Sequence, residues 1–322
     1  MKGVRYIGLI IVAALTACNS IPEVDQPIRE CATPPEGRAV AMSFSAGEII
    51  YIVSGRKPNN AYSQTMLRYN TDTDQWDESS AIPITPRANG TACATQQGVF
   101  LGLGYNGGNV HNEASYLHDW WCYNPQNEQW TRKADFPVSQ TVAAISWTDN
   151  QYIWVGFGFN GFTNVVWRYD IQADTWTKQE QSGSIPDRAM SPVVAQCNGR
   201  YFAGTGFRRY SRSGWWEWFA DGHWEGRASV PGSGRHNAIS AGTDKHVWVM
   251  GGWHYGDSLT TGFHYEDILR YTPETNQWAY CGTLPCGTME NGTACGIGNR
   301  LYFGLGEDKF GHLHTHWYLI ED

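Results

Sequence analysis

The sequence predicts an all-β protein assembled from repeated sheets, on the grounds of its composition, its low charge and a recurring strand motif. Tryptophan, tyrosine and phenylalanine supply 16, 17 and 12 of the 322 residues, and glycine supplies 36. Aromatic residues favour strands, and glycine favours the turns that join them. Only 17% of the residues are charged, which argues against a coiled coil, a long-helix protein or a disordered chain.

The recurring motif is an apolar run that ends in glycine, and it occurs six times. The six runs cover residues 51–55, 99–104, 153–158, 201–206, 247–252 and 301–306. Their last glycines lie 46 to 54 residues apart, a period typical of propeller blades, in which each repeat forms one sheet. The first five runs are each followed by an aromatic residue, a turn and a tryptophan, at Tyr69 and Trp76, Tyr123 and Trp130, Tyr169 and Trp176, Trp218 and Trp224, and Tyr271 and Trp278.

A strand closed by glycine, then a tyrosine, then a tryptophan at a fixed offset resembles the kelch repeat. The resemblance covers about residues 27–320 and implies a six-bladed kelch β-propeller. A full double glycine stands only at Gly251–Gly252, and the first position of the other runs is Ser54, Leu103, Phe157, Thr205 or Leu305. Because the five tryptophans recur once per repeat, we expect them to pack between blades rather than to contact a ligand.

The last repeat lacks its tryptophan strand, and the beginning of the chain supplies a substitute. Residues 27–32 stand before a proline pair and Arg38 much as residues 76–81 stand before two prolines and Arg87. We therefore expect the propeller to span residues 27–322, with its N-terminal strand completing the last blade. Closing the ring in this way removes the free edges of the sheets.

Residues 1–17 have the features of an export signal. Lys2 and Arg5 precede an apolar run that is too short to span a bilayer as a helix. The sequence LTAC at residues 15–18 resembles the lipobox of bacterial lipoproteins, which implies lipidation of Cys18 and a tether over residues 18–26. An ordinary signal peptide with a chance cysteine is the alternative. Asn19 resembles an outer-membrane sorting signal, so we expect a protein of the bacterial cell envelope that contacts the membrane through its lipid anchor only.

Charge and motif content bear on partners and cofactors. The formal net charge is −8, so we expect no nucleic-acid partner. The sequence has no phosphate-binding loop, dinucleotide fingerprint or zinc motif, and we expect no cofactor and no metal. His312, His314 and His316 alternate, so a strand would place them on one side, where a hydrogen-bonded cluster is expected and a metal site is the alternative. Two nearby cysteines, Cys281 and Cys286, would either form a disulfide or stay free.

Each repeat has one residue, here called the lead residue, shortly before its innermost strand. The lead residues are Arg38, Arg87, Thr141, Arg188, Arg235 and Met289. In a propeller this position and the loop between the second and third strands of a blade (the b–c loop) share one face. We therefore expect the four arginines to converge at the mouth of the central channel and to bind a carboxylate, sulfate or phosphate. Alternatively, they satisfy loop carbonyls inside the blades.

The b–c loops add further candidate binding residues. Arg208 extends the expected basic sector, and Tyr105, Trp253 and Tyr255 are suited to stack on the apolar faces of sugar rings. Ordinary turn structure is the alternative role for these residues. The pattern predicts a site for an anionic glycan, or for another acidic ligand such as a peptide, on the b–c loop face.

Glu307 resembles a catalytic group. Exported bacterial N-acetylneuraminate epimerases are kelch propellers that interconvert sialic acid anomers, and Glu307 resembles the glutamate that they place behind a blade glycine. The resemblance implies that Glu307 is a general base beside an arginine that holds the sugar carboxylate. His312 stands where that arginine is expected, and Glu290 is a further candidate acid or base.

Three functions therefore remain open at the level of sequence. The first is binding of an anionic glycan or other acidic ligand. The second is mutarotation or epimerisation of an acidic sugar such as N-acetylneuraminate. The third is a protein-interaction scaffold for another envelope protein.

Overall fold

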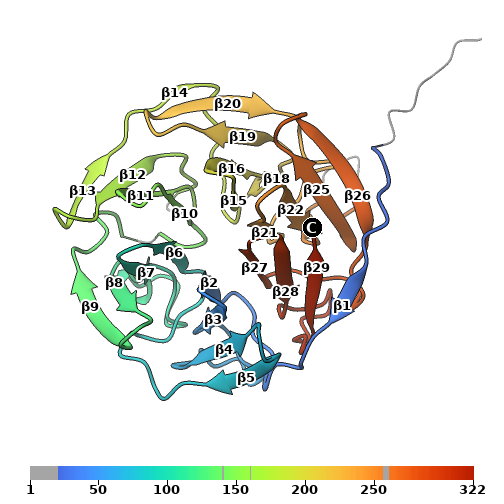
Figure 1. Cartoon of the computed structure of the whole chain (residues 1–322). Coiled ribbons are helices and arrows are strands. Elements are labelled where there is room, and N and C mark those ends of the chain that lie inside the picture. Colours follow the sequence, from blue (N-terminus) through green and yellow to red (C-terminus); the bar gives the residue numbers. More distant parts are fainter. Residues whose placement is uncertain (1–20, 140, 160, 257–260) are drawn as a thin grey trace, which may run out of the picture.

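The computed structural model describes residues 21–322 except residues 140, 160 and 257–260. The described chain forms six antiparallel sheets, each with four main strands, arranged as blades around a central channel (Figure 1). The predicted all-β, six-bladed propeller is thereby confirmed. The helical element of the described chain is one short 3-10 turn, Glu113–Ser115, and none of its helices is long and apolar enough to cross a bilayer. The expected lipidation site, Cys18, lies outside the described residues.

In the first five blades the strands follow one another outward from the channel in chain order. Blades 1 and 2 consist of β2 (Met42–Ala46), β3 (Ile49–Val53), β4 (Met66–Asn70) and β5 (Gln75–Glu78), and of β6 (Thr91–Thr95), β7 (Gly98–Gly102), β8 (Trp120–Asn124) and β9 (Gln129–Lys133). Blades 3 and 4 consist of β10 (Ile145–Thr148), β11 (Tyr152–Gly156), β12 (Val166–Asp170) and β13 (Thr175–Lys178), and of β15 (Val193–Cys197), β16 (Arg200–Gly204), β19 (Trp215–Trp218) and β20 (His223–Arg227).

Blade 5 has the same design, and blade 6 takes one strand from the other end of the chain. The two blades consist of β21 (Ile239–Gly242), β22 (Val247–Met250), β25 (Asp267–Thr272) and β26 (Gln277–Thr283), and of β27 (Thr293–Ile297), β28 (Arg300–Gly304), β29 (Trp317–Glu321) and β1 (Ile28–Glu30). Short strands decorate blades 4 and 5, namely β14 (Ser182–Gly183), β17 (Phe207–Arg208), β18 (Tyr210–Ser211), β23 (Trp253–His254) and β24 (Phe263–His264).

The middle strands are apolar on both faces because each blade packs between two neighbours. In β3, Ile50 and Ile52 are fully buried against side chains of blade 6, including Trp317. On the opposite face of the same strand, Val53 packs against Leu101 of blade 2. Side chains alternate along a strand with a period of two, so one five-residue apolar strand supplies two separate inter-blade cores.

The ring is closed by the N-terminal strand, as the sequence predicts. Strand β1 pairs antiparallel with β29, with Ile28 opposite Ile320 and Glu30 opposite Tyr318. Figure 1 shows β1 in blue as the outer edge of the red sixth blade. Just upstream, Glu23 forms a bridge with Tyr280 in the outer strand of blade 5. The beginning of the chain therefore joins two blades, and the outer edge of β29 is paired rather than free.

The repeated tryptophans pack between blades, which confirms their expected role. Trp76 of blade 1 lies 5.3 Å from Trp317 of blade 6 between ring centroids, and its indole nitrogen donates to the carbonyl of Ala32 at 2.8 Å. Trp176 and Trp278 repeat both contacts with their own preceding blades. Each such tryptophan combines a large buried surface with one inter-blade hydrogen bond.

The closing glycines link consecutive blades through their backbones. The N–H of Gly306 donates to the carbonyl of Arg38 at 2.7 Å, which joins the sixth blade to the first. Gly306 has a φ of +77°, and a Cβ there would lie 2.5 Å from the carbonyl oxygen of Glu290. Equivalent bonds run to the next blade from Gly55, Gly104, Gly158, Gly206 and Gly252. The residue before Gly306, Leu305, also has a positive φ, of 56°, and the drifted double-glycine motif therefore keeps its backbone shape with other residues.

All seven cysteines of the described chain are free. The structure therefore chooses the second of the two alternatives for Cys281 and Cys286. Cys281 is buried in the core between blades 5 and 6, and burial raises the pKa of its thiol. A thiol buried in this way contributes to core packing rather than to a disulfide that would close the loop between residues 281 and 286.

Candidate ligand site on the b–c loop face

The lead segments and the b–c loops meet on one face of the propeller. In every blade, a residue one or two positions after the lead residue forms an isolated β-bridge. Its partner is the residue that follows the closing glycine. The residues after the closing glycines, here called the mouth ring, are Arg56, Tyr105, Phe159, Phe207, Trp253 and Glu307. Four members are aromatic and two are oppositely charged, so the mouth has an aromatic side and a charged side.

Three of the expected ligand-binding arginines do not reach this mouth. The side chains of Arg87 and Arg235 are fully buried, and each guanidinium binds an aspartate of its own blade through two hydrogen bonds. Arg87 meets Asp119 at 2.6 and 2.8 Å, and Arg235 meets Asp267 at the same distances. Burial alone would raise the pKa of Asp119, but the hydrogen bonds from Arg87 outweigh it and leave that pKa lowered. These arginines hold the blade together, so their expected role in ligand binding is corrected.

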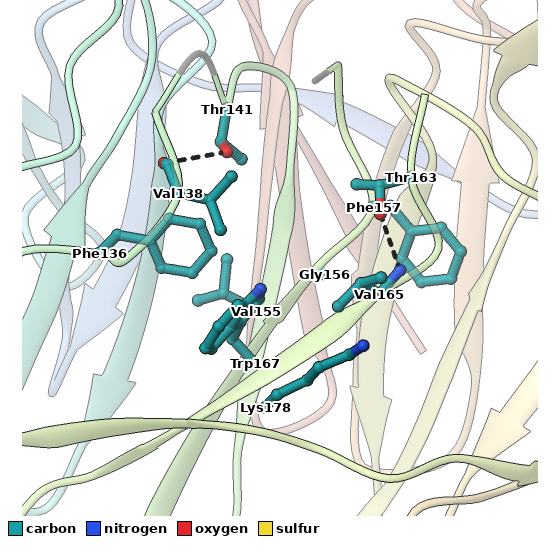
Figure 2. A pocket seen from close by; sticks show the side chains of 10 residues that line it. All are labelled: Phe136, Val138, Thr141, Val155, Gly156, Phe157, Thr163, Val165, Trp167 and Lys178. Carbon is teal, nitrogen blue, oxygen red and sulfur yellow. Dashed lines mark hydrogen bonds between the residues drawn. The ribbon is translucent and has the colours of Figure 1, made fainter. Parts of the chain in front are cut away.

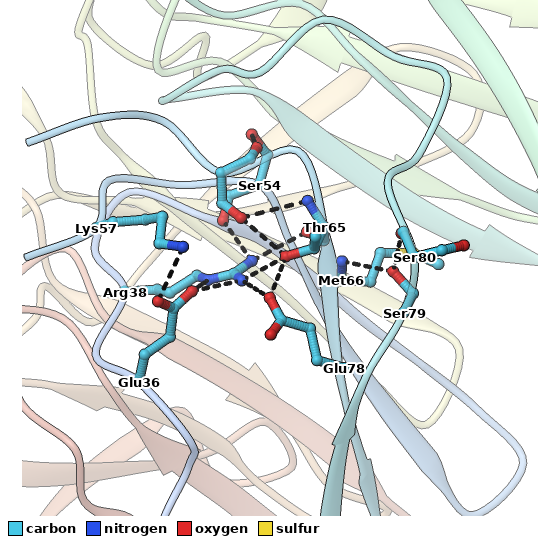
Figure 3. A network of polar contacts seen from close by, with 10 residues as sticks. Glu36, Arg38, Ser54, Lys57, Thr65, Met66, Glu78, Ser79 and Ser80 are labelled. Carbon is cyan, nitrogen blue, oxygen red and sulfur yellow. Dashed lines mark hydrogen bonds and ion pairs between the residues drawn. The ribbon is translucent and has the colours of Figure 1, made fainter.

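Arg38 occupies the same internal position in blade 1. Figure 3 shows its guanidinium enclosed by polar partners, among them Glu36 at 2.7 Å and Glu78 at 3.0 Å. It also donates to the carbonyls of Ser54 and Thr65. The side chain has no exposed surface. Arg38 therefore satisfies carbonyls and carboxylates inside the blade, which was the alternative role, and does not have the ligand contact that we expected.

The remaining predicted arginines lie at the surface. Arg188 is exposed, and the buried Ala189 takes the lead position of blade 4 instead, because the N–H of Gly158 donates to the carbonyl of Ala189. Arg208 is exposed on the short strand β17. Tyr105 is a half-buried member of the mouth ring and lies 6.3 Å from Tyr62 between ring centroids. Tyr255 is 47% exposed beside Trp253. The structure thus brings the predicted aromatic residues, but not the buried arginines, to the loop face.

The charged side of the mouth joins blades 6 and 1. Arg56 forms an ion pair with Glu307, and the amide of Asn291 donates to the other oxygen of that carboxylate at 2.9 Å. The side chains of Arg56 and Glu307 remain 21% and 14% exposed. This pair is therefore accessible in a way that the fully buried lead arginines are not. Arg56 is the residue that the sequence reasoning overlooked, and its position after a closing glycine is the signal that would have revealed it.

A second carboxylate lies opposite the first. Glu290 bridges Glu307 across the two backbones. Its oxygens contact the imidazole Nε2 of His264 at 3.3 Å and the amide of Asn237 at 3.0 Å. The exposed fractions of Glu290 and His264 are 14% and 19%. The mouth therefore holds two half-buried carboxylates on paired backbone segments, one with a nitrogen partner on blade 1 and the other with a nitrogen partner on blade 5.

The aromatic side of the mouth adjoins this acid–base group. Trp253 stacks on His264 with ring centroids 5.6 Å apart and planes 9° apart. His236 lies 5.0 Å from both Trp253 and Phe207. Burial, together with the nearby His254 and His264, lowers the pKa of His236 to about 4. A neutral imidazole at ordinary pH fits the apolar stacking role of His236.

A small cavity lies in the central channel, where residues that follow the lead residues of all six blades surround it. It has a volume of about 170 Å³ and is lined in part by Asn89, Asn237 and Asn291. Two of these asparagines are the same residues that hold Glu290 and Glu307. The two carboxylates are thus connected to the channel through the amide side chains of Asn237 and Asn291.

The three alternating histidines do not act together. Residues 312–316 are not a strand. His312 is 79% exposed and contacts Asp308 at 3.1 Å, whereas His314 and His316 contact the carbonyl of Thr288 and the carboxylate of Glu30. No group of three or more metal-binding side chains occurs in the described part of the chain. The expectation that a strand would gather these histidines on one side is therefore wrong.

Comparisons with known proteins agree with the fold. No protein-family model matches the chain. Kelch-like protein 35 from Homo sapiens is 25% identical over 143 residues, which is 44% of this chain and 22% of that protein. N-acetylneuraminate epimerases from Shigella flexneri serotype 5b and Escherichia coli K12 are 25% identical over 243 residues, which is 72% of this chain and 58% of theirs. The chain thus spans less than two thirds of the length of these curated relatives.

A solved structure provides a longer match. The structure of YjhT superposes with a TM-score of 0.72 over 91% of this chain and 95% of that one, at 15% sequence identity. Likeness at this identity shows the fold alone.

Proposed function

Because the chain is a kelch-repeat β-propeller, we propose that its b–c loop face binds an acidic sugar and interconverts the anomers of that sugar. The observation that carries the proposal is the pair of half-buried carboxylates, Glu307 and Glu290, each held by a nitrogen partner at the mouth. The likeness to N-acetylneuraminate epimerases over 72% of the chain supports it. Of the sequence-level alternatives, this one uses the groups that the mouth exposes.

Anomer exchange needs two proton transfers, and the mouth has groups for both. One group takes the proton of the anomeric hydroxyl while another protonates the ring oxygen, so that the ring opens and can close on the other face. In this proposal, Glu307 is the base and His264, which is bonded to Glu290, is the acid. Arg56 beside Glu307 holds the sugar carboxylate through its planar guanidinium. Trp253 offers an aromatic face to the C–H face of the sugar.

Proton NMR of anomer exchange tests this assignment. The purified protein is expected to accelerate exchange of N-acetylneuraminate or glucuronate more than that of neutral glucose. Glu307→Gln is expected to lower the catalysed rate by roughly 100-fold or more, since general base catalysis contributes about 10²–10⁴. Glu128→Gln is the matched control, because Glu128 is exposed and pairs with Arg68 on the third strand of blade 1. A folded protein that accelerates none of these sugars would overturn the catalytic proposal.

A scaffold is the second candidate, and exposed apolar side chains favour it. Eight large apolar side chains of the described chain are markedly exposed, and six lie in b–c loops, at Val110, Phe159, Tyr210, Tyr255, Phe263 and Phe310. Exposed apolar groups gathered on one face mark a surface for a macromolecule. Crosslinking from Phe310 and Tyr255 positions in intact cells tests this candidate. A recurrent protein partner supports a scaffold, whereas crosslinks to carbohydrate alone support the sugar site.

The cellular place of the protein is part of the proposal. We assign it to the bacterial envelope through lipid attached at Cys18, on the lipobox-like sequence at residues 15–18. Labelled palmitate is expected to enter the full-length protein and to be lost in Cys18→Ala. Label that persists in Cys18→Ala would contradict the assignment.

A further inference from the structure

Blade 3 has an open slot where blades 1, 2 and 5 hold a buried arginine. The lead residue of blade 3 is Thr141, and its side chain lines a cavity of about 260 Å³. The walls are mainly apolar and are formed by Phe136, Val138, Val155, Phe157, Val165 and Trp167, with Gly156, Thr163 and Lys178 at the remaining sides (Figure 2). This slot is separate from the mouth ring, and no residue of the proposed sugar site lines it.

Comparison with blade 2 shows why the slot is open. There the lead residue Arg87 extends to Asp119, the residue just before the third strand of the blade. In blade 3 the residue before the third strand is Val165, so both members of the ion pair are replaced. Thr141 is much shorter than arginine, and Val165 offers no charge. In blade 2 this place is filled by an ion pair, whereas in blade 3 it is an open slot with mainly apolar walls.

Comparison with blade 1 shows that the charge at the rim is also reversed. Figure 2 shows the slot of blade 3, and Figure 3 shows the polar network around Arg38 in blade 1. In blade 1, Glu78 of the outer strand contacts the buried Arg38 at 3.0 Å. Strand register places Lys178 at the equivalent position of blade 3, because Trp167 faces Lys178 as Leu67 faces Glu78. Glu78, which pairs with the buried Arg38 in blade 1, is thus replaced in blade 3 by the cationic Lys178, which lies beside the apolar slot.

We propose that this slot binds a small apolar carboxylic acid, whose ring or short acyl chain fills the cavity and whose carboxylate pairs with the ammonium group of Lys178. An apolar cavity of roughly 150 Å³ accepts benzene, so about 260 Å³ accommodates a ring with a short substituent. No acidic side chain lines the slot, which disfavours a cationic ligand. Lys178 is exposed, so an anionic group can meet it without being buried.

Three probes of similar size test both parts of the proposal, namely phenylacetate, 2-phenylethanol and 2-phenylethylamine. Binding is followed by the NMR shifts of the methyl groups of Val138, Val155 and Val165. Phenylacetate is expected to bind about five-fold more tightly than the alcohol, as a surface ion pair would give, and the amine more weakly than both. In Lys178→Ala the acid and the alcohol are expected to bind equally, whereas Lys245→Ala, at an exposed lysine of blade 5, keeps the preference.

Filling the slot provides the second test. Met289 is the fully buried lead residue of blade 6, so Thr141→Met places a side chain that this fold already accepts there. It is expected to abolish binding of all three probes. Thr141→Arg combined with Val165→Asp recreates the pair of blade 2 and is expected to do the same. Three results would each overturn the proposal. They are saturable shifts in a folded variant whose slot is filled, the absence of any shift in the wild-type protein, and equal binding of the acid and the alcohol by the wild-type protein.

Discussion

Arg56 of the first blade forms an ion pair with Glu307 of the last, across 251 residues of sequence. The pair lies at the seam where the ring closes, and both side chains remain partly exposed at the mouth. It differs in this respect from the buried pair of Arg235 with Asp267, which lies within one blade. The first ion pair is accessible from the mouth, whereas the guanidinium of the second is enclosed within its blade.

Arg56→Gln is expected to weaken the use of a sugar acid while sparing that of a neutral sugar. A charge-assisted hydrogen bond contributes about 1.5–3 kcal/mol, so KM for the acid should rise by roughly 10-fold or more. Anomer-exchange kinetics on glucuronate and glucose measure the difference. Equal losses for the two sugars would show that Arg56 does not hold the carboxylate.

Arg235→Met is expected to destabilise the protein strongly, whereas Arg188→Met should change little. Removing Arg235 leaves Asp267 without the partner that it meets at 2.6 Å, and breaking a buried pair costs about 3–5 kcal/mol. Arg188 is exposed, and surface changes usually stay within about 0.5 kcal/mol. Urea unfolding of both variants provides the measurement, and equal midpoints would contradict the structural role of Arg235.

Gly306→Ala is expected to cost several kcal/mol, more than the same change at Gly199. Both glycines have positive φ, of 77° and 73°, but a Cβ at Gly199 meets nothing within 4 Å. The left-handed backbone alone costs about 1 kcal/mol with a side chain. The additional loss of stability at Gly306 comes from the new Cβ, which would lie only 2.5 Å from the carbonyl oxygen of Glu290. Thermal unfolding of the two variants separates these costs.

Stability is expected to fall as the pH drops from about 6.5 to about 4, in part through His236. Its pKa is about 4 in the folded protein against 6.5 for the free side chain, so the unfolded chain binds the proton first as the pH falls. The stability that comes from keeping His236 neutral is therefore complete above pH 6.5 and is progressively lost down to the folded pKa. His236→Phe keeps the stacking and should flatten this slope in urea titrations, whereas His118→Asn, at a half-exposed histidine, should not.

Removing residues 21–35 is expected to lower the melting temperature by roughly 10 °C or more and to promote association. The deletion takes away β1 and exposes the edge of β29, and an unpaired edge recruits other strands. A chain that lacks only residues 2–20 keeps all of these strand pairs and is the control. Calorimetry and size-exclusion chromatography measure the two effects, and an unchanged melting temperature would contradict closure by this strand.

Local sequence determined the fold of this protein almost completely. The glycine after each apolar run and the tryptophan of each outer strand are short-range features, and the strand at residues 27–32 is recognised by its local pattern although it pairs with residues 318–320. They predict blades correctly because each blade contacts only its neighbours, so one repeat contains nearly all the information about its own packing.

Tertiary structure alone decided which charged residues face the mouth. Arg38 and Arg56 are close in sequence, yet the first is enclosed by Glu36 and Glu78, and the second reaches Glu307 of the last blade. Arg38, Arg87 and Arg235 are buried because their own blades supply counter-charges and carbonyls, and that supply depends on strand register. The sequence therefore determined the ring, whereas the contacts across blades decided its chemistry, because burying a charge requires partners that only the assembled sheets bring within reach.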